Sequence, residues 1–326
     1  MLEIMFKRIL VPLDGSGRAE RALPIAARLA RATGGSIFLV RVLSTEPARL
    51  PSAPGKPNLV QTIGQADRAL AESYLAGVAE SELLTGIPVQ TYVPVGLISP
   101  SILTMAAEKH ADIIVMCSHG YTGVKRWWMM GSVAAKVARF ADIPVLVLRE
   151  GGSVPEERHP GERPLRVLVP LDGSDYARAA LVPAAYLAAA LAAPGRGALH
   201  LTHIVQPTNE GKAARATQNT QALLNMAKEY LEATIHYLRE GSLDPGIVNL
   251  NLEFTSSVIV DDEIAQGILR VAEDGGNGEG VGVFGGCDAI AMTTQGYSGL
   301  QRWVGSVTER VLDTSRLPLL IVRPRE

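Results

Sequence analysis

Two short segments of this sequence place a carboxylate, a glycine and a hydroxyl directly after an apolar run. Asp14–Ser16 follows RILVPL, and Asp172–Ser174 follows RVLVPL. A carboxylate at the end of a strand can accept a hydrogen bond from a base or a ribose hydroxyl. It can equally accept from the free backbone N–H groups that begin the next helix. These residues alone leave both interpretations of Asp14 and Asp172 open.

A second pair of segments has the composition of an anion site. The sequence Gly-Ser-Val occurs at 131–133 and again at 305–307, each time after a loop and at the start of an amphipathic segment. A helix that begins there offers free N–H groups, a hydroxyl and the positive end of its dipole, all of which suit a phosphate. The preceding loop opens with Gly120 or Gly296, where the backbone can approach a ligand closely. Because the arrangement occurs twice, we favour anion binding over a plain helix cap.

Both sets of residues recur in the same order because the chain is an internal duplication. RILVPLDGS at 8–16 matches RVLVPLDGS at 166–174, and YTGVKRWWMMGSV near the end of one half resembles YSGLQRWVGSV in the other. Repeats of this kind define the units of the fold. We predict a first domain over residues 1–150, a linker rich in Gly, Pro and charge over 151–164, and a second domain over 165–326.

The elements that must position these residues are strands alternating with helices. Runs that are apolar at nearly every position indicate strands buried on both faces, as in a parallel sheet. The predicted strands are 8–13, 36–42, 89–95, 112–117 and 143–148, then 166–171, 198–205, 248–255, 287–293 and 317–322. The predicted fold class is α/β, with two tandem doubly wound domains, each a five-stranded, mostly parallel sheet flanked by helices. Ligands of such sheets bind beyond the carboxyl ends of the strands.

The VPLDGS start, the H-G or Q-G after the fourth strand and the later G-S-V resemble the universal stress protein family over nearly all of both halves. The resemblance implies a tandem, ATP-binding protein of the stress-response or regulatory type, in which the Gly-Ser helix start holds the nucleotide, with Mg²⁺ on its phosphates. It implies the following ligand contacts: Pro12, Leu13, Asp14, Val42, Met116, Cys117, Gly120, Gly131, Ser132 and Val133, and then Pro170, Leu171, Asp172, Ile204, Met292, Thr293, Gly296, Gly305, Ser306 and Val307.

The sequence departs from the family signature G-x2-G-x9-G-[ST] at two points. Cys117 and Thr293 stand where the signature has its first glycine. The loop encloses ten residues between Gly120 and Gly131, and eight between Gly296 and Gly305. A shortened loop has less slack with which to bring the helix start to a phosphate. We therefore expect two unequal sites, of which the first binds more tightly.

The composition excludes several classes of protein. With 31 basic and 33 acidic residues, the chain lacks the charge excess that is typical of nucleic-acid binding. Its longest apolar stretch, 179–194, is shorter than the roughly 20 residues that span a bilayer. Its two cysteines are typical of a reducing compartment, and we expect a cytoplasmic protein. We expect neither a catalytic set nor a metal site, since His200 and His203 should point to opposite faces of one strand.

Three functions remain open. The first is nucleotide binding without fast turnover. The second is a slow ATP hydrolase, for which only Asp14 and Asp172 could act as a base or as metal carboxylates. The third is a scaffold that no longer binds nucleotide. In all three, the resemblance implies that the apolar closing strands pair between the halves. The chain would then form an intramolecular pseudo-dimer, and two tandem chains could form a homodimer.

Overall fold

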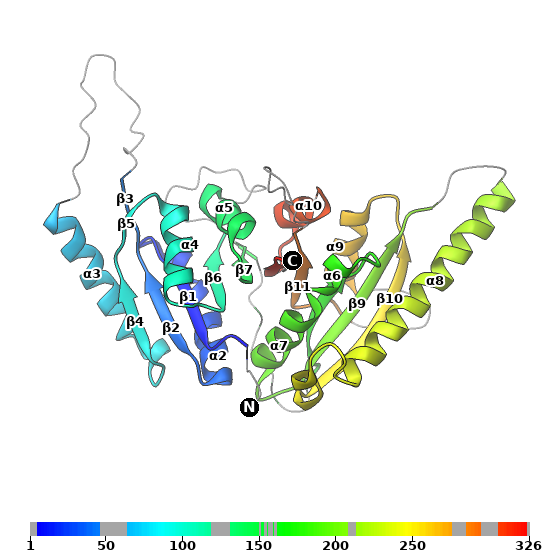
Figure 1. The fold of residues 1–326 in the computed structure, drawn as a ribbon, viewed down its shortest axis with the longest axis horizontal. Coiled ribbons are helices and arrows are strands. Elements are labelled where there is room, and N and C mark those ends of the chain that lie inside the picture. The colour runs from blue at the N-terminus through cyan, green and yellow to red at the C-terminus, as the bar shows by residue number, and fades with distance from the viewer. Residues whose placement is uncertain are drawn as a thin grey trace, which may run out of the picture.

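The computed structural model describes residues 5–45, 64–118, 131–149, 151–152, 155, 159, 162–207, 213–275, 285–294 and 306–324. Figure 1 shows two similar halves side by side, with the carboxyl-terminal end of the chain near their junction.

The first half alternates strands and helices. Its elements are β1 (Arg8–Pro12), α1 (Gly17–Glu20), α2 (Ala22–Thr33), β2 (Ser36–Val40), β3 (Leu43–Ser44), α3 (Gln65–Ala79), the 3-10 helix η1 (Glu82–Leu84), β4 (Val89–Tyr92), β5 (Val95–Gly96), α4 (Ile98–Glu108), β6 (Ile113–Cys117), α5 (Ser132–Phe140) and β7 (Val145–Leu148).

The second half repeats this order. Its elements are β8 (Leu165–Pro170), α6 (Asp175–Arg178), α7 (Leu181–Ala192), β9 (Gly197–Val205), α8 (Ala213–Arg239), the 3-10 helix η2 (Pro245–Asn249), β10 (Leu252–Val260), α9 (Ile264–Asp274), β11 (Ala289–Thr293), α10 (Ser306–Thr314) and β12 (Leu319–Val322).

The strands of both halves form one ten-stranded sheet in the order β10-β9-β8-β11-β12-β7-β6-β1-β2-β4. Within each half all neighbouring strands of this sheet are parallel. The first strand lies in the middle: β1 lies between β2 and β6, and β8 lies between β9 and β11. This is the doubly wound arrangement that the sequence predicts, in which the chain reverses direction beside the first strand. In sheets of this kind the reversal is where a ligand crevice forms, which here is beyond the carboxyl ends of β1 and β8.

The two halves join through their last strands. β7 and β12 pair antiparallel, with Leu320 opposite Leu146, and both side chains are fully buried. Helices α2, α3, α7 and α8 contribute to one apolar cluster that runs through both halves. Helices α4, α5, α9 and α10 contribute to a second cluster, which also contains residues of both halves. The pairing between closing strands that we expected is therefore present within this chain.

Polar contacts reinforce the junction. The Arg149 guanidinium donates to the carbonyl of Asp313 at the end of α10, at 2.8 Å, and that of Arg323 donates to the Asp142 carboxylate at 2.7 Å. On the other face of the sheet, α2 packs on α7. The Arg28 guanidinium of α2 donates to carbonyl oxygens of Pro155 and Leu191.

The largest error in strand placement concerns β10. The sequence predicts a strand over 248–255, whereas β10 spans Leu252–Val260 and η2 occupies the residues before it. Asp244 caps η2, because its carboxylate accepts from the N–H of Gly246 at 2.7 Å. Pro245 favours the first turn of a helix because it lacks the N–H that would be unbonded there. The small pair of β3 with β5 was also absent from the sequence prediction.

Candidate functional site

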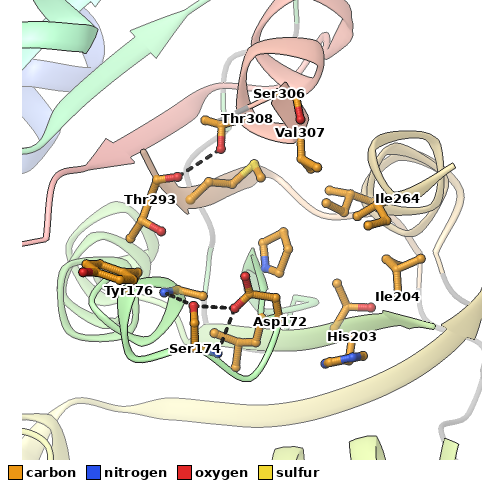
Figure 2. Close-up of a pocket in the computed structure, with 16 residues that line it drawn as sticks. Asp172, Ser174, Tyr176, His203, Ile204, Ile264, Thr293, Ser306, Val307 and Thr308 are labelled. Atoms are coloured by element: carbon orange, nitrogen blue, oxygen red, sulfur yellow. Dashed lines mark hydrogen bonds between the residues drawn. The ribbon is translucent and has the colours of Figure 1, made fainter. Parts of the chain in front are cut away.

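The second half contains a pocket of about 210 Å³ at the carboxyl ends of β8, β9 and β11. Figure 2 shows its side chains, which come from the turn after β8, from the ends of β9 and β11, and from the starts of α9 and α10. The lining residues are Pro170, Leu171, Asp172, Ser174, Tyr176, Ala177, Thr202, His203, Ile204, Ile264, Ile268, Met292, Thr293, Ser306, Val307 and Thr308. The pocket thus lies at the position where doubly wound sheets bind ligands.

The turn after β8 fixes the carboxylate of Asp172. Its Oδ1 accepts from the backbone N–H and from the hydroxyl of Ser174, at 2.9 and 2.6 Å. The Ser174 hydroxyl oxygen then accepts from the N–H of Ala177 at 3.2 Å and caps α6. Gly173 between them has φ +87°, a conformation that other residues adopt only with strain. Figure 2 shows the second carboxylate oxygen of Asp172 directed into the pocket, so the turn and a ligand do not compete for one atom.

The first half builds the same turn with nearly identical geometry. Asp14 Oδ1 accepts from the Ser16 N–H at 3.0 Å and from its hydroxyl at 2.6 Å, and Gly15 also has φ +87°. Two interpretations of Asp14 and Asp172 were left open, and one of them was a helix cap. In the structure Ser16 and Ser174 cap the helices, and the aspartates do not. The aspartates order the turn in front of that cap, and both are exposed at the strand ends.

A buried polar network supports the floor of the pocket. The hydroxyl of Thr202 lies 3.2 Å from that of Ser257, and Ser257 lies 2.8 Å from Nε2 of His200. The other ring nitrogen of His200 lies 2.8 Å from the Thr255 hydroxyl. Burial, aided by the positive charge of Arg166, lowers the pKa of His200 to about 3, so the ring is neutral at pH 7. Phe38 and Val40 hold the matching places in the first half, which has no such network there.

Apolar side chains form the wall opposite the turn. Ile204, Met292 and Val307 belong to one buried cluster, together with Ile264 and Ile268 at the start of α9. This wall suits a flat aromatic ring, because it removes apolar surface from water without requiring polar partners. In the first half, Val42, Met116 and Val133 occupy the corresponding cluster positions, next to Ile98 and Ile102 of α4.

The start of α10 closes the far end of the pocket. Ser306 is the first residue of the helix, and the hydroxyl of Thr308 donates to the carbonyl of Thr293 at 3.0 Å. This bond ties the beginning of α10 to the end of β11. In the first half α5 begins at Ser132, and its N-cap Gly131 provides no side-chain bond to the helix. The Gly131 N–H donates to the carbonyl of Ser118 at 2.8 Å and so holds the two ends of the intervening loop together.

The structure brings most of the sequence-predicted residues to these two strand edges. Those of the second half that line the pocket are Pro170, Leu171, Asp172, Ile204, Met292, Thr293, Ser306 and Val307. The predicted residues of the first half lie at the ends of β1, β2 and β6, just after these strands, or at the start of α5. They are Pro12, Leu13, Asp14, Val42, Met116, Cys117, Gly131, Ser132 and Val133. Gly120, Gly296 and Gly305 lie outside the described residues. The two loop lengths on which we based unequal affinity lie there as well.

Sequence reasoning missed the other residues of the pocket. Ser174 was visible as part of the repeated DGS motif, and Ile264 and Ile268 could have been found as the apolar face at the start of a predicted helix. Thr202 and Tyr176 gave no signal, because single hydroxyl and aromatic residues recur throughout the chain. His200 and His203 have different partners, as strand alternation requires. Figure 2 shows the His203 ring turned away from the pocket.

A doubly wound sheet flanked by helices, with a pocket at its strand ends, defines an α/β protein, and the family comparison agrees with this class. The model of the universal stress protein family matches residues 5–149 and again 165–323, so the chain belongs to that family and contains two of its units.

Relatives match one or both units. The universal stress protein Rv2623 of Mycobacterium tuberculosis is 27% identical over 326 residues, covering 97% of this chain and 96% of the relative. A universal stress protein of Thermus aquaticus is 32% identical over 148 residues, covering 44% of this chain and all of the relative (100%). The crystal structure of a universal stress protein from Archaeoglobus fulgidus has a TM-score of 0.59 at 18% identity and covers 98% of each chain.

Two searches of the described residues gave no candidates. None of the helices in the described ranges is both long and apolar enough to cross a membrane. In the same part of the chain, no three His, Cys, Asp or Glu side chains are grouped in a way that could hold a metal ion.

Proposed function

We propose that this chain is a stress-response or regulatory protein that binds ATP, with Mg²⁺ on the phosphates, at the strand ends of each half and without fast turnover. One observation supports the proposal above the others: eight of the ten residues that the family resemblance assigns to ATP in the second half line one pocket there. It combines an apolar wall, a carboxylate and a helix start, which are the three chemistries that a base, a ribose and a phosphate require.

Backbone geometry supports adenine as the base. The last hydrogen bond at the divergence of β8 and β9 runs from the N–H of Leu171 to the carbonyl of Thr202, at 2.8 Å. Alternate residues of a parallel strand turn their backbone groups to the same side, so Ile204 directs its N–H and C=O toward the pocket. Adenine offers a donor at N6 beside an acceptor at N1, which complements this pair. Guanine has the acceptor O6 where adenine has its N6 donor, and this O6 would face the carbonyl oxygen of Ile204. We therefore expect ATP to bind in preference to GTP.

The expected positions of the ribose and the phosphates follow from the position of the base. The second oxygen of Asp172 faces the apolar wall and the start of α10 across the pocket, where it can accept from a ribose hydroxyl. The backbone N–H groups that begin α10 and α5 are the donors for phosphate, aided by the helix dipole. Mg²⁺ would be held chiefly by the phosphates, since it commonly binds through substrate oxygens with few protein carboxylates.

Calorimetry with the whole chain tests this proposal. We expect heat of binding with Mg-ATP, little with Mg-GTP, and slow or no release of phosphate. Asp172→Asn keeps the acceptor for Ser174 but replaces the other oxygen with an NH₂ donor, so affinity at the second site should fall about tenfold. Asp175→Asn is the matched control, because the Asp175 side chain is 97% exposed and pairs with Arg178. We expect that variant to keep its affinity.

Other outcomes would favour the alternatives. Absence of heat with any adenine nucleotide would reject the proposal in favour of a scaffold that has lost its ligand. Rapid release of phosphate would favour an ATP hydrolase. Native mass spectrometry of freshly purified protein is an independent readout, because a nucleotide held at either site should co-purify with the chain.

A further inference from the structure

Arg41 and His203 occupy matching positions in the two halves. Each directly follows the strand residue whose carbonyl accepts the last β1–β2 or β8–β9 hydrogen bond, from the N–H of Leu13 or Leu171. Each also lies against the ring of a tyrosine in the next long helix. The guanidinium carbon of Arg41 is 4.9 Å from the ring centroid of Tyr74 in α3. The His203 ring is 6.5 Å from that of Tyr230 in α8, in an edge-to-face arrangement.

In the first half this position carries a permanent positive charge beneath the turn. A Cβ atom on Gly15 would lie 3.3 Å from the Arg41 guanidinium, so the cation packs directly behind the turn that presents Asp14. The Tyr74 hydroxyl donates to the Glu20 carboxylate at 2.7 Å. Tyr74 therefore contacts the Arg41 cation through its ring and the Glu20 anion through its hydroxyl. An arginine in this place stays charged at every pH at which the protein is folded.

In the second half the same position is titratable. His203 Nδ1 and the Tyr230 hydroxyl are buried, and within the described ranges neither has a hydrogen-bond partner. The charged groups around them are Asp172 in the turn after β8, and Asp175 and Arg178 on α6. Burial lowers the pKa of His203, and the Asp172 carboxylate opposes this effect by raising it. Burial also raises the pKa of Tyr230, which therefore keeps its proton.

We propose that Arg41 and His203 determine the charge preference of the two sites: the first favours phosphate-rich nucleotides at every pH, whereas the second gains affinity for them on acidification. This inference rests on the proposed function. With His203 neutral, the strand position that holds the Arg41 cation in the first half carries no charge in the second, and the carboxylate of Asp172 repels the phosphates of a nearby nucleotide. Protonation of His203 offsets the repulsion, and a bound polyphosphate in turn favours the protonated ring, because proton and anion binding are linked.

The experiment measures each site separately in the full chain. Val42→Trp fills the base position of the first site, so that only the second site can bind. Ile204→Trp fills the base position of the second site, so that only the first can bind. In the Val42→Trp chain we expect Mg-ATP affinity to rise about three- to tenfold between pH 7.5 and 5.5, relative to the same chain with His203→Gln. Because both chains are titrated with the same ligand, protonation of ATP itself cancels in this ratio.

Exchange of the two residues gives the reciprocal test. His203→Arg should raise the affinity of the second site at pH 7.5 and abolish its gain on acidification. Arg41→His in the Ile204→Trp chain should weaken the first site at pH 7.5 and give it that gain. Thermal melting checks that each variant is folded. Calorimetry in two buffers of different ionisation enthalpy needs no change at His203 and should show more proton uptake at the second site than at the first.

The outcomes separate this inference from the function on which it rests. If the gain on acidification persists in His203→Gln, or proton uptake is equal at the two sites, the inference is wrong while ATP binding stands. If the unaltered chain binds no adenine nucleotide at either pH, the proposed function fails and the inference fails with it.

Discussion

At the scale of single residues, the two halves share a turn and differ in what lies behind it. Asp14 and Asp172 are held by the same pair of hydrogen bonds to a serine two residues later. The surrounding side chains are not conserved between the halves. The second half has a neutral, fully buried His200 beneath its pocket, where the first half has Phe38. A duplicated backbone therefore presents two sites with different electrostatics.

The buried histidine predicts a particular loss of stability in acid. The pKa of His200 is about 3 in the folded chain, below its ordinary value of 6.5. The unfolded chain thus binds more protons below pH 6.5, and stability is highest above that pH. We expect the free energy of unfolding to fall by about 1.4 kcal/mol per pH unit from 6.5 toward 3 on account of this residue.

Urea unfolding at a series of pH values measures this slope. His200→Gln should flatten it, because Gln does not titrate and can still bond to the hydroxyls of Thr255 and Ser257. His236→Gln is the control, since the His236 side chain is 65% exposed and pairs with Glu240, the residue that follows α8. Equal slopes for the unaltered chain and His200→Gln would contradict the prediction.

At the scale of elements, the antiparallel pair of β7 and β12 covers the edge that each five-stranded sheet would otherwise expose. Long apolar edge strands are prone to pair with other chains, so covering them removes an aggregation hazard. Leu320 in β12 is fully buried and faces Leu146 across the junction. The junction is therefore part of the core and not a loose contact between domains.

Truncation at this junction should be costly. We expect Leu320→Ala to lower the free energy of unfolding by about 2–5 kcal/mol, through lost apolar burial and the cavity left behind. Leu223→Ala is the matched control, because Leu223 is 40% exposed on α8 and should change stability by less than about 0.5 kcal/mol. Denaturant unfolding measures both. Similar small effects at the two positions would show that the junction contributes little.

At the scale of the whole molecule, the duplicated units form one continuous sheet between two shared layers of helices (Figure 1). The segment between them is anchored on both sides. The Arg21 guanidinium donates to the carbonyl of Gly152 at 3.1 Å, and Arg163 makes two hydrogen bonds to Asp288, at 3.0 and 2.8 Å. The β7–β12 pair and the packing of α2 on α7 lie outside this segment, so we expect the halves to stay associated without their covalent connection.

Cleavage between the halves tests this conclusion. A protease recognition sequence inserted between residues 157 and 158 allows the connection to be cut in the folded protein. We expect the two fragments to co-elute on gel filtration at the volume of the uncut chain, because the strand pair and the packing of α2 on α7 remain. The same insertion left uncut is the control, and elution of two separate fragments would contradict the prediction.

The sequence by itself determined the repeat, the doubly wound fold and half of the residues that line the pocket. Runs such as RILVPL are apolar on both faces, which requires a buried parallel strand, and the residues just beyond those strands must meet at one edge of the sheet. These are local patterns, and they recur in both halves in the same order.

Only the tertiary structure decided what surrounds those residues. Thr202 supports the pocket floor because Ser257, on the neighbouring strand, lies opposite it in the sheet. His203 and Arg41 acquire matching contacts because helices far along the chain bring Tyr230 and Tyr74 against them. The start of β10 shifted because the capped turn at Asp244 competes with strand pairing there. Contacts of this kind depend on register and packing between distant segments, which local residue patterns do not encode.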